Sequence, residues 1–552
     1  MTNPPPVPEG YGHLPGPPQQ GYGQPQQGNP YAQQPQQAQQ PPYPQQQPQQ
    51  PAYPQQPPQQ PPGYGYPPPV PPGPPQGPGN PAKRKLTILI AAAVAGVLVI
   101  GTGSYFAFFA GDDEKKTAQT PSASPSGDAK PGDPSPSASV DDGDGSGNGA
   151  KEETDLNAGR KPGEDKVLWL KTNEVELPGN GAEAPAQWIV GDTVVKAVYK
   201  SVTAYGVTDG KQRWSIPFTG VICSAINQST QDGKTVVAFK NGDTSSSDCN
   251  QLKQIDLKAG KEGWTKEVPE EGLFDIMTSV SLAITGDTLT VSRMGTASAF
   301  KVSTGDKLFG RPAGGCKPSA YAGGGTKLIA VAGCGDETEE LQGVDPATGK
   351  PAWSFKFDKG WAVNKVYSTD PVVVVDVNKR STKERAIAVF GPDGKKRTHL
   401  TGEGKFSARC GMSIFSGPQS CQGVVVDAST NTMYMPTEGT GNEIVAFDLG
   451  TGKVKWRVPA GERRSAMPLK AENGRLIAYL EPGYEQGGEV VSYAAGGGQP
   501  TTLLRNPAGA SAVERTFFSP RVDYADGRLF LSATRLSGRS EGPEKFLMVF
   551  GK

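Results

Sequence analysis

Apolar and polar residues alternate in short runs from about Lys166 to the C-terminus, separated by glycine-containing turns. A period of two predicts β-strands with one buried face, and glycine accepts the positive φ of tight turns. The clearest unit is EIVAFDLGTGKVKWRVP, residues 443–459, which predicts a hairpin with Trp456 four residues after Gly452. Two strands alone cannot bury an apolar face, so this unit predicts further copies.

The hairpin recurs with an aromatic residue four positions after the turn glycine. The pairs are Gly210 with Trp214, Gly260 with Trp264, Gly305 with Phe309 and Gly349 with Trp353. Two degenerate copies, at Gly394 and in VSYAAGGGQPT, carry threonine instead. The last strand, KFLMVFGK, ends at Lys552 without a following partner, while KVLWLKT places Trp169 where the repeats begin. We therefore expect the two ends to pair and close a ring.

A second repeated element, a turn followed by a mostly apolar strand, precedes each hairpin. Its eight copies begin at Gly191, Asp232, Gly286, Gly324, Asp370, Thr430, Asn473 and Asp526. Spacings of about 40 to 60 residues are typical of four-stranded propeller blades. The pattern predicts an all-β fold, an eight-bladed β-propeller over residues 166–552, with seven blades as the alternative because two hairpins are degenerate.

The turn-and-tryptophan repeat resembles the blade of the PQQ-like (quinoprotein dehydrogenase-like) β-propellers. The strongest copies are FDLGTGKVKW, VDPATGKPAW and IDLKAGKEGW. The resemblance implies that the Thr-Gly turn and the aromatic side chain dock one blade on its neighbour. This gives a structural role to Trp169, Trp214, Trp264, Phe309, Trp353 and Trp456. The layout also resembles actinobacterial membrane proteins in which a Pro/Gln/Gly/Tyr tail precedes a single span.

Residues 1–82 consist largely of Pro, Gln, Gly and Tyr, with one acidic residue, Glu9. Such a segment cannot bury enough apolar surface to offset the entropy of ordering, which predicts disorder with polyproline character. The composition favours a solvated tail over a proline-rich ligand for a cytoplasmic partner, and that ligand stays the alternative.

A membrane anchor is predicted at residues 83–110. Lys83, Arg84 and Lys85 precede 25 uncharged, mostly apolar residues from Leu86 to Ala110, enough to cross a bilayer. Basic residues before the span and acidic ones directly after it place the N-terminus in the cytoplasm. We therefore expect a single-pass protein of the cell membrane with an extracytoplasmic propeller.

Residues 111–165 form a predicted disordered linker rich in Ser, Pro, Gly and Asp, with 13 acidic and 6 basic residues. Within it, DGDGSGNGAKEE has the spacing of a calcium loop. The matching positions include Asp142, Asp144, Ser146 and Glu153. No amphipathic helix pattern flanks them, so the sequence favours a plain acidic linker.

All six cysteines lie in the propeller region, on the predicted oxidising side of the membrane. Six cysteines allow fifteen connectivities. The repeat favours sequential pairing, with each disulfide stapling one blade: Cys223 with Cys249, Cys316 with Cys334, and Cys410 with Cys421. Metal ligation is the weaker interpretation because the whole chain has only two histidines.

The propeller region carries 46 basic and 41 acidic residues, a mild and scattered excess that argues against nucleic-acid binding. A quinoprotein dehydrogenase would be expected to show adjacent cysteines, a calcium site and a channel aspartate. Here no two cysteines are adjacent, and His399 is the single histidine of the domain. We predict no catalytic residue, no cofactor and no enzymatic activity.

The remaining function is binding. The sequence favours a membrane-anchored scaffold that recruits an unknown envelope protein or ligand. A ligand sensor coupled to the cytoplasmic tail is one alternative, and a PQQ-dependent dehydrogenase is the other. The tail contains no kinase, phosphatase or DNA-binding pattern, which favours the scaffold over the sensor.

Overall fold

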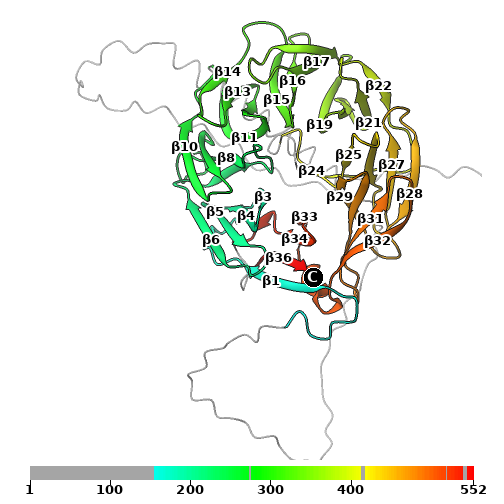
Figure 1. Ribbon diagram of the computed structural model, residues 1–552. Coiled ribbons are helices and arrows are strands. Elements are labelled where there is room, and N and C mark those ends of the chain that lie inside the picture. Colours follow the sequence, from blue (N-terminus) through cyan, green and yellow to red (C-terminus); the bar gives the residue numbers. More distant parts are fainter. Residues whose placement is uncertain (1–154, 273–274, 412–416, 518, 539–543) are drawn as a thin grey trace, which may run out of the picture. The chain divides into compact units, whose positions relative to one another are not determined.

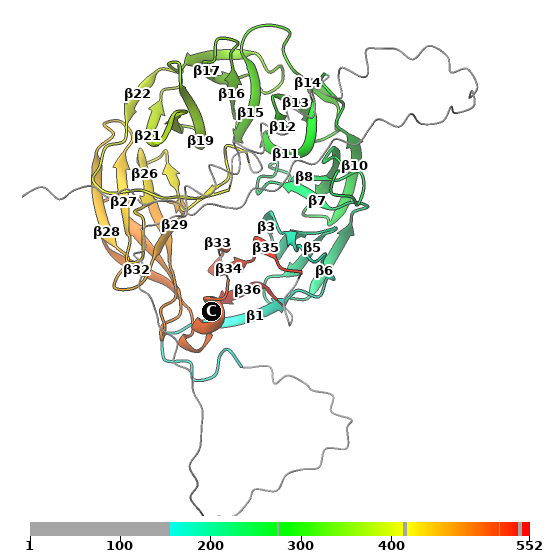
Figure 2. The same cartoon turned by 180° about the vertical axis from the view of Figure 1, so that it is seen from behind.

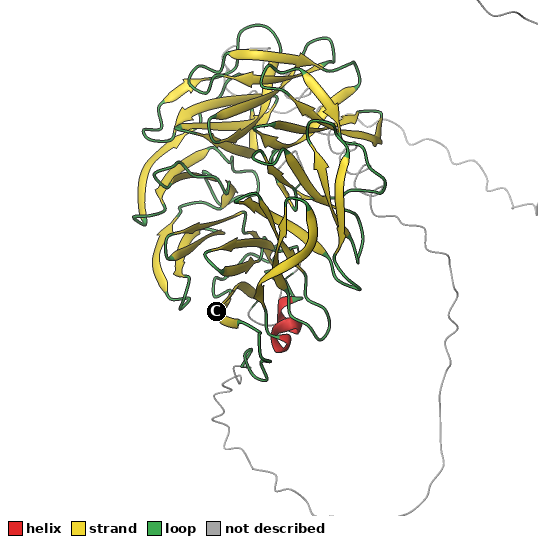
Figure 3. Cartoon of the chain, turned by 45° about the vertical axis from the view of Figure 1, so that its right-hand side comes forward, coloured by secondary structure: helices red, strands yellow, loops and turns green. Residues whose placement is uncertain are grey.

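The computed structural model describes residues 155–552, apart from 273–274, 412–416, 518 and 539–543. Eight four-stranded antiparallel sheets follow one another around a ring (Figures 1 and 2). The prediction of eight blades rather than seven is thus confirmed. Figure 3 shows that strands dominate, with helix confined to η1 (Ala508–Ala510) and α3 (Ser511–Glu514) among the described residues.

Blades 1 to 4 are built from consecutive strands. Blade 1 contains β3 (Ala186–Val190), β4 (Thr193–Val198), β5 (Ser201–Gly206) and β6 (Gln212–Pro217). Blade 2 contains β7 (Ile222–Ala225), β8 (Lys234–Phe239), β9 (Gln251–Asp256) and β10 (Lys261–Glu267). Blade 3 contains β11 (Ile276–Thr285), β12 (Thr288–Met294), β13 (Thr296–Lys301) and β14 (Lys307–Phe309). Blade 4 contains β15 (Lys317–Gly324), β16 (Lys327–Gly333), β17 (Glu339–Val344) and β18 (Pro351–Lys356).

Blades 5 to 7 follow the same order. Blade 5 contains β19 (Trp361–Thr369), β20 (Val372–Asn378), β21 (Ser381–Phe390) and β22 (Lys396–His399). Blade 6 contains β25 (Val425–Asp427), β26 (Thr432–Pro436), β27 (Glu443–Asp448) and β28 (Val454–Pro459). Blade 7 contains β29 (Ala466–Glu472), β30 (Arg475–Leu480), β31 (Glu489–Ala494) and β32 (Gly497–Arg505).

Blade 8 joins the two ends of the propeller. Its strands are β33 (Arg521–Ala525), β34 (Arg528–Ser532), β36 (Lys545–Gly551) and, from the other end of the domain, β1 (Lys166–Thr172). The antiparallel register places Trp169 opposite Val549. Closure of the ring by its terminal strands is therefore confirmed.

The connections between strands define two different faces. Because neighbouring strands are antiparallel, successive connections emerge at opposite ends of each blade. We call one end the turn face, formed by residues 207–211, 257–260, 302–306, 345–350, 391–395, 449–453 and 495–496. The other end is the loop face, formed by residues 240–250, 334–338, 400–411, 417–424, 481–488, 506–517 and 533–538.

On the turn face, each aromatic residue of the repeat lies against the turn glycine of the next blade. A Cβ atom added to Gly260 would lie 2.4 Å from Trp214, and one added to Gly394 would lie 2.3 Å from Trp353. The same contact pairs Gly210 with Trp169, Gly305 with Trp264, Gly349 with Phe309 and Gly497 with Trp456. Glycine is therefore required at these positions for two reasons. It accepts the positive φ, and it leaves room for the aromatic ring that packs on it.

Polar contacts accompany this packing. The indole Nε1 of Trp264 donates a hydrogen bond to the Val302 carbonyl at 2.8 Å, and Trp456 donates to Ala495 at 2.8 Å. Where threonine replaces the aromatic residue, Thr398 and the carbonyl of the next residue occupy the space opposite Gly452. The second strand of each blade is largely buried between neighbouring blades, as in β4 and β26.

The predicted tail, membrane span and most of the linker lie outside the described residues. In the part of the chain that the structure describes, no helix has the length and apolar character needed to cross a bilayer. The boundaries at residues 82, 110 and 165 stay predictions.

Candidate functional site

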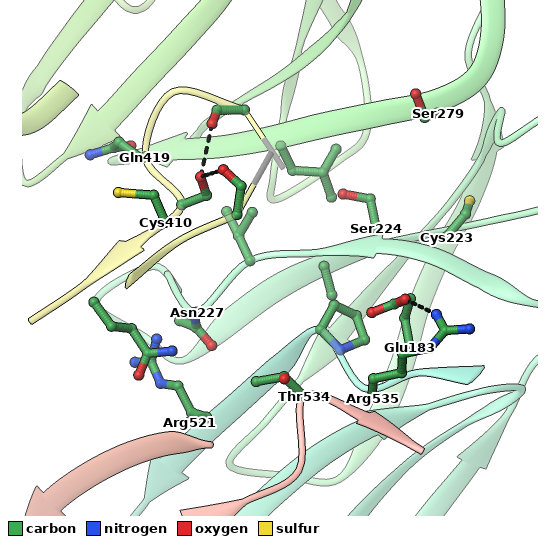
Figure 4. A pocket seen from close by; sticks show the side chains of 18 of the residues that line it. Glu183, Cys223, Ser224, Asn227, Ser279, Cys410, Gln419, Arg521, Thr534 and Arg535 are labelled. Carbon is green, nitrogen blue, oxygen red and sulfur yellow. Dashed lines mark hydrogen bonds and ion pairs between the residues drawn. The ribbon is translucent and has the colours of Figure 1, made fainter. Parts of the chain in front are cut away.

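The inner strands of the blades surround a cavity of about 1190 Å³ (Figure 4). Its walls come from β7, β11, β15 and β33, and from the two-stranded sheet of β2 (Ala182–Glu183) and β35 (Arg535–Leu536). A segment between blades 5 and 6 supplies the remaining wall with residues 407–411 and 417–422. This cavity is the candidate site because it gathers polar side chains from blades far apart in the sequence.

The segment between blades 5 and 6 is a disulfide-closed hairpin. Strands β23 (Arg409–Cys410) and β24 (Cys421–Gln422) pair with each other, and Cys410 is bonded to Cys421. The pairing agrees with the prediction, but its expected location inside a blade was wrong. The connection from β22 to β25 is long enough to leave the blade and turn into the channel, so this disulfide closes the channel hairpin instead.

The side chain of Gln419 attaches the channel hairpin to blade 4. The Gln419 amide accepts from the backbone N–H of Gly323 at 2.7 Å and donates to its carbonyl at 2.8 Å. Gln228 also donates to the Gly323 carbonyl, at 2.8 Å. These side chains act as hydrogen-bond partners for the main-chain groups of Gly323, which have no main-chain partner among the described residues at this end of β15.

Lys365, on β19, holds the other side of the hairpin. Its Nζ donates to the carbonyl of Gly411 at 2.5 Å and to the hydroxyl of Ser420 at 2.7 Å. Burial lowers the pKa of Lys365 to about 8, because an ammonium group is poorly stabilised away from water. The lysine therefore serves as a donor that fixes the hairpin.

Blades 7 and 8 also contact the hairpin. Arg409 forms an ion pair with Glu481 in blade 7. The side-chain oxygen of Gln422 accepts a hydrogen bond from the backbone of Val522, in blade 8, at 3.3 Å. The hairpin is thus connected to the ring from several directions.

Another part of the wall combines blades 8 and 1. Arg521 donates to both carboxylate oxygens of Asp523, at 2.8 and 2.9 Å, and Asp523 accepts from Gln187 at 2.8 Å. Close by, Glu183 and Arg535 form an ion pair across the β2–β35 sheet (Figure 4). Their charges neutralise each other.

The other two disulfides also lie on the loop face, and both staple single blades as predicted. Cys223 of β7 is bonded to Cys249 in the β8–β9 connection. Cys316, just before β15, is bonded to Cys334 just after β16. Glu340 lies near the second pair, but both sulfurs are already in a covalent bond, so this group does not suit a metal ion.

The aromatic residues singled out in the sequence do not line the cavity. Trp169, Trp214, Trp264, Phe309, Trp353 and Trp456 lie on outer strands, against the turn glycines. His399, on β22, has its Nε2 4.0 Å from Asp376, and neither residue lines the cavity. The candidate calcium-loop residues Asp142, Asp144, Ser146 and Glu153 are outside the described residues.

The cavity does not fit a quinone–calcium pair. Calcium takes six to eight oxygen ligands, usually with several carboxylates. Among the described lining residues Glu183 is the one carboxylate, and Arg535 already pairs with it. The hairpin also occupies part of the channel.

Sequence reasoning missed the residues that build this site, including Gln419, Lys365 and Arg521. One signal was available, since the connection between the hairpin of blade 5 and the second strand of blade 6 departs from the repeat and contains two cysteines. The partners of that connection come from other blades, and their positions follow from ring closure.

Comparison with known proteins agrees with the repeat. A family model described as outer membrane protein assembly factor BamB matches residues 161–315 and 313–535. Among curated proteins there is no match. The crystal structure of BamB from Moraxella catarrhalis is 14% identical, covers 70% of this chain and 100% of its own, and has a TM-score of 0.39.

Quinohemoprotein alcohol dehydrogenase ADHIIG from Pseudomonas putida HK5 is 12% identical, covers 70% of this chain and 76% of its own, and has a TM-score of 0.42. The assignment rests on the family model, which spans most of the propeller and confirms the PQQ-like repeat expected from the turn-and-tryptophan motif. The chain belongs to the family of the outer membrane protein assembly factor BamB.

Proposed function

We propose that this protein is a non-catalytic, membrane-anchored scaffold that binds another protein of the cell envelope through its loop face. In this proposal the Pro/Gln-rich tail is cytoplasmic, residues 86–110 cross the membrane once, and the propeller is extracytoplasmic. The family is named for an assembly factor, which supports a role in binding other proteins.

One observation carries the proposal: the polar groups in the cavity wall and directly behind it are held by hydrogen bonds to one another. Arg521 is held by Asp523, and Lys365 is buried against oxygens of the hairpin. Covalent catalysis would need a nucleophile with an adjacent base. Fixed hydrogen-bonding groups on a disulfide-supported surface suit recognition of a partner instead.

Site-specific photo-crosslinking in cells tests the scaffold proposal. A photoreactive amino acid replaces Ser407 on the loop face or, as the matched control, Thr451 on the turn face; both residues are exposed. We expect a discrete adduct with an envelope protein from position 407 and none from position 451. Adducts of equal yield from both positions, or none from either, would contradict the proposed use of the loop face.

A thermal-shift measurement tests the non-catalytic part. A ligand that binds only the folded state raises the melting temperature by mass action. We expect PQQ with calcium to leave the melting temperature of the full-length protein unchanged. A rise that requires both components would instead support the dehydrogenase alternative.

A further inference from the structure

The side chains that line the cavity include more hydrogen-bond donors from basic residues than acceptors from acidic ones. The cationic lining residues are Lys240, Arg409, Arg521 and Arg535, whereas Glu183 is the single acidic residue among the described lining. Each arginine in this group pairs with a carboxylate: Arg535 with Glu183, Arg409 with Glu481 and Arg521 with Asp523. A guanidinium group has five N–H donors, so each arginine keeps donors that its carboxylate partner does not use, whereas the Glu183 carboxylate is occupied. A ligand that supplies acceptors therefore matches the walls better than one that supplies donors.

Arg521 is held at the cavity wall by a network of hydrogen bonds. Its Nε and Nη2 bind Asp523, whose carboxylate is held in turn by Gln187. These bonds fix the guanidinium plane, while Nη1 has no hydrogen bond to a described residue. The side chain lines the cavity (Figure 4), so this nitrogen is a pre-oriented donor for a carboxylate.

Asn227 supplies a second donor near Arg521. Its Oδ1 accepts the backbone N–H of Gln187 at 3.0 Å, and Gln187 also binds the Asp523 that holds Arg521. Because a backbone N–H requires an acceptor, this bond fixes the orientation of the amide and leaves Nδ2 as the donor end. Figure 4 shows both side chains in the same part of the cavity.

The size and shape of the cavity favour a peptide. Its volume of about 1190 Å³ exceeds the roughly 300–1,000 Å³ of small-molecule sites. One wall consists of consecutive residues, Val221 to Gln228, which include β7. Since β7 is the innermost strand of its blade, it is an edge strand, and an extended peptide can run along such an edge.

We infer that the channel cavity binds an extended, acidic segment of a partner protein, with one acidic side chain received by Arg521 and Asn227. The inference rests on the proposed scaffold function and specifies the chemistry of the partner. Arg521 donates a charge-assisted hydrogen bond to the acidic side chain, and the Asn227 amide donates a second hydrogen bond that sets the orientation of the bound carboxylate.

Fluorescence anisotropy with the full-length protein tests this inference. The probes are fluorescein-labelled hexaglutamate, hexaglutamine and hexalysine. We expect hexaglutamate to bind at least tenfold more tightly than the other two, and its affinity to fall with added salt because exposed charges are screened. Arg521→Gln should weaken hexaglutamate binding at least tenfold.

Two variants make the test specific. Arg213→Gln is the matched control, because Arg213 also pairs with an aspartate, Asp209, but lies outside the cavity; its affinity should equal that of the wild type. Asn227→Asp keeps the acceptor for the Gln187 N–H and replaces the donor with a negative charge. It should weaken binding without changing the melting temperature, and it carries the test if Arg521→Gln fails to fold.

Hexaglutamine binding as tight as hexaglutamate binding, or equal losses in Arg213→Gln and Arg521→Gln, would overturn the inference. Free glutarate that competes as well as unlabelled hexaglutamate would also overturn it, because the ligand would then be a small dicarboxylate. If hexaglutamate fails to bind while the photo-crosslinked adduct from position 407 still forms, the acidic segment is rejected and the scaffold proposal remains intact.

Discussion

The two faces of this propeller are stabilised in different ways. On the turn face, short connections repeat from blade to blade, and aspartates accept backbone N–H groups within the turn. Asp448, for example, accepts from Gly450 at 3.0 Å and from Thr451 at 2.8 Å. On the loop face, long connections carry all three disulfides and contain the channel hairpin.

The difference shows how a repeat protein separates structure from binding. Turn-face contacts are local in the repeat, since each aromatic residue meets the glycine of the next blade. Loop-face contacts join distant segments, as between Arg409 and Glu481. The turn-face contacts therefore hold each blade to its neighbour, whereas the loop-face contacts connect segments that are far apart in the sequence.

The largest effect is expected from Trp456→Ala on the turn face. Trp456 packs on Gly497 and has ring contacts with Tyr434 and Tyr493. Its loss leaves a cavity between two blades and should lower the free energy of unfolding by about 3–5 kcal/mol, measured by urea denaturation. Trp456→Phe, which keeps most of the packing, should recover more than half of the loss. An unchanged free energy of unfolding in Trp456→Ala would contradict the docking role of this residue.

A somewhat smaller effect is expected from the loop-face disulfides. Replacing Cys223 and Cys249 by serine opens a loop with a sequence separation of 26 and should cost about 3 kcal/mol. Replacing Cys410 and Cys421, separated by 11, should cost less, because a shorter loop restricts the unfolded chain less. The reverse order in urea midpoints would mean that the channel hairpin braces the ring more strongly than loop entropy alone.

Lys196 should make the free energy of unfolding of the propeller depend on pH. Its Nζ donates to the carbonyls of Ala184 and Ala533, and burial, with the nearby charge of Arg521, lowers its pKa to about 7. Between pH 7 and 10 the unfolded chain binds more protons at this residue than the folded one. Stability should therefore rise with pH, by up to about 1.4 kcal/mol per pH unit.

The measurement compares urea unfolding of wild type and Lys196→Met at pH 7 and pH 9. The wild type should gain stability relative to the variant between these two values. The variant removes the titrating amine and leaves the other groups in place, so parallel pH profiles would mean that the folded pKa of Lys196 is not lowered.

The smallest effect separates the two reasons for glycine in these turns, which are the positive φ and the space for an aromatic ring. Gly260 and Gly286 both have positive φ, 64° and 56°. An added Cβ at Gly260 would meet Trp214 at 2.4 Å, whereas at Gly286 it would meet nothing within 4 Å. Gly260→Ala should therefore cost about 1 kcal/mol more than Gly286→Ala in thermal unfolding. Equal losses in stability would mean that glycine is needed at both positions only for its positive φ.

The sequence predicted the fold in detail because its signals are local and repeated. The apolar second strands identified eight blades, and the unpaired KFLMVFGK strand together with Trp169 identified the closure. The sequential disulfide pairing also followed from the repeat. What the repeat could not indicate was that the Cys410–Cys421 hairpin leaves its blade, since that connection has no counterpart in the other blades.

By itself, the sequence determined the propeller, the number of blades, the closing strands and the disulfide partners, because alternation, turn glycines and aromatic spacing act over a few residues. Only the tertiary structure decided which residues share the channel. Arg521, Asn227 and Gln419 lie in three different blades or connections, and ring closure brings them to one cavity. Contacts across that cavity depend on the curvature of the whole ring, which no local pattern encodes.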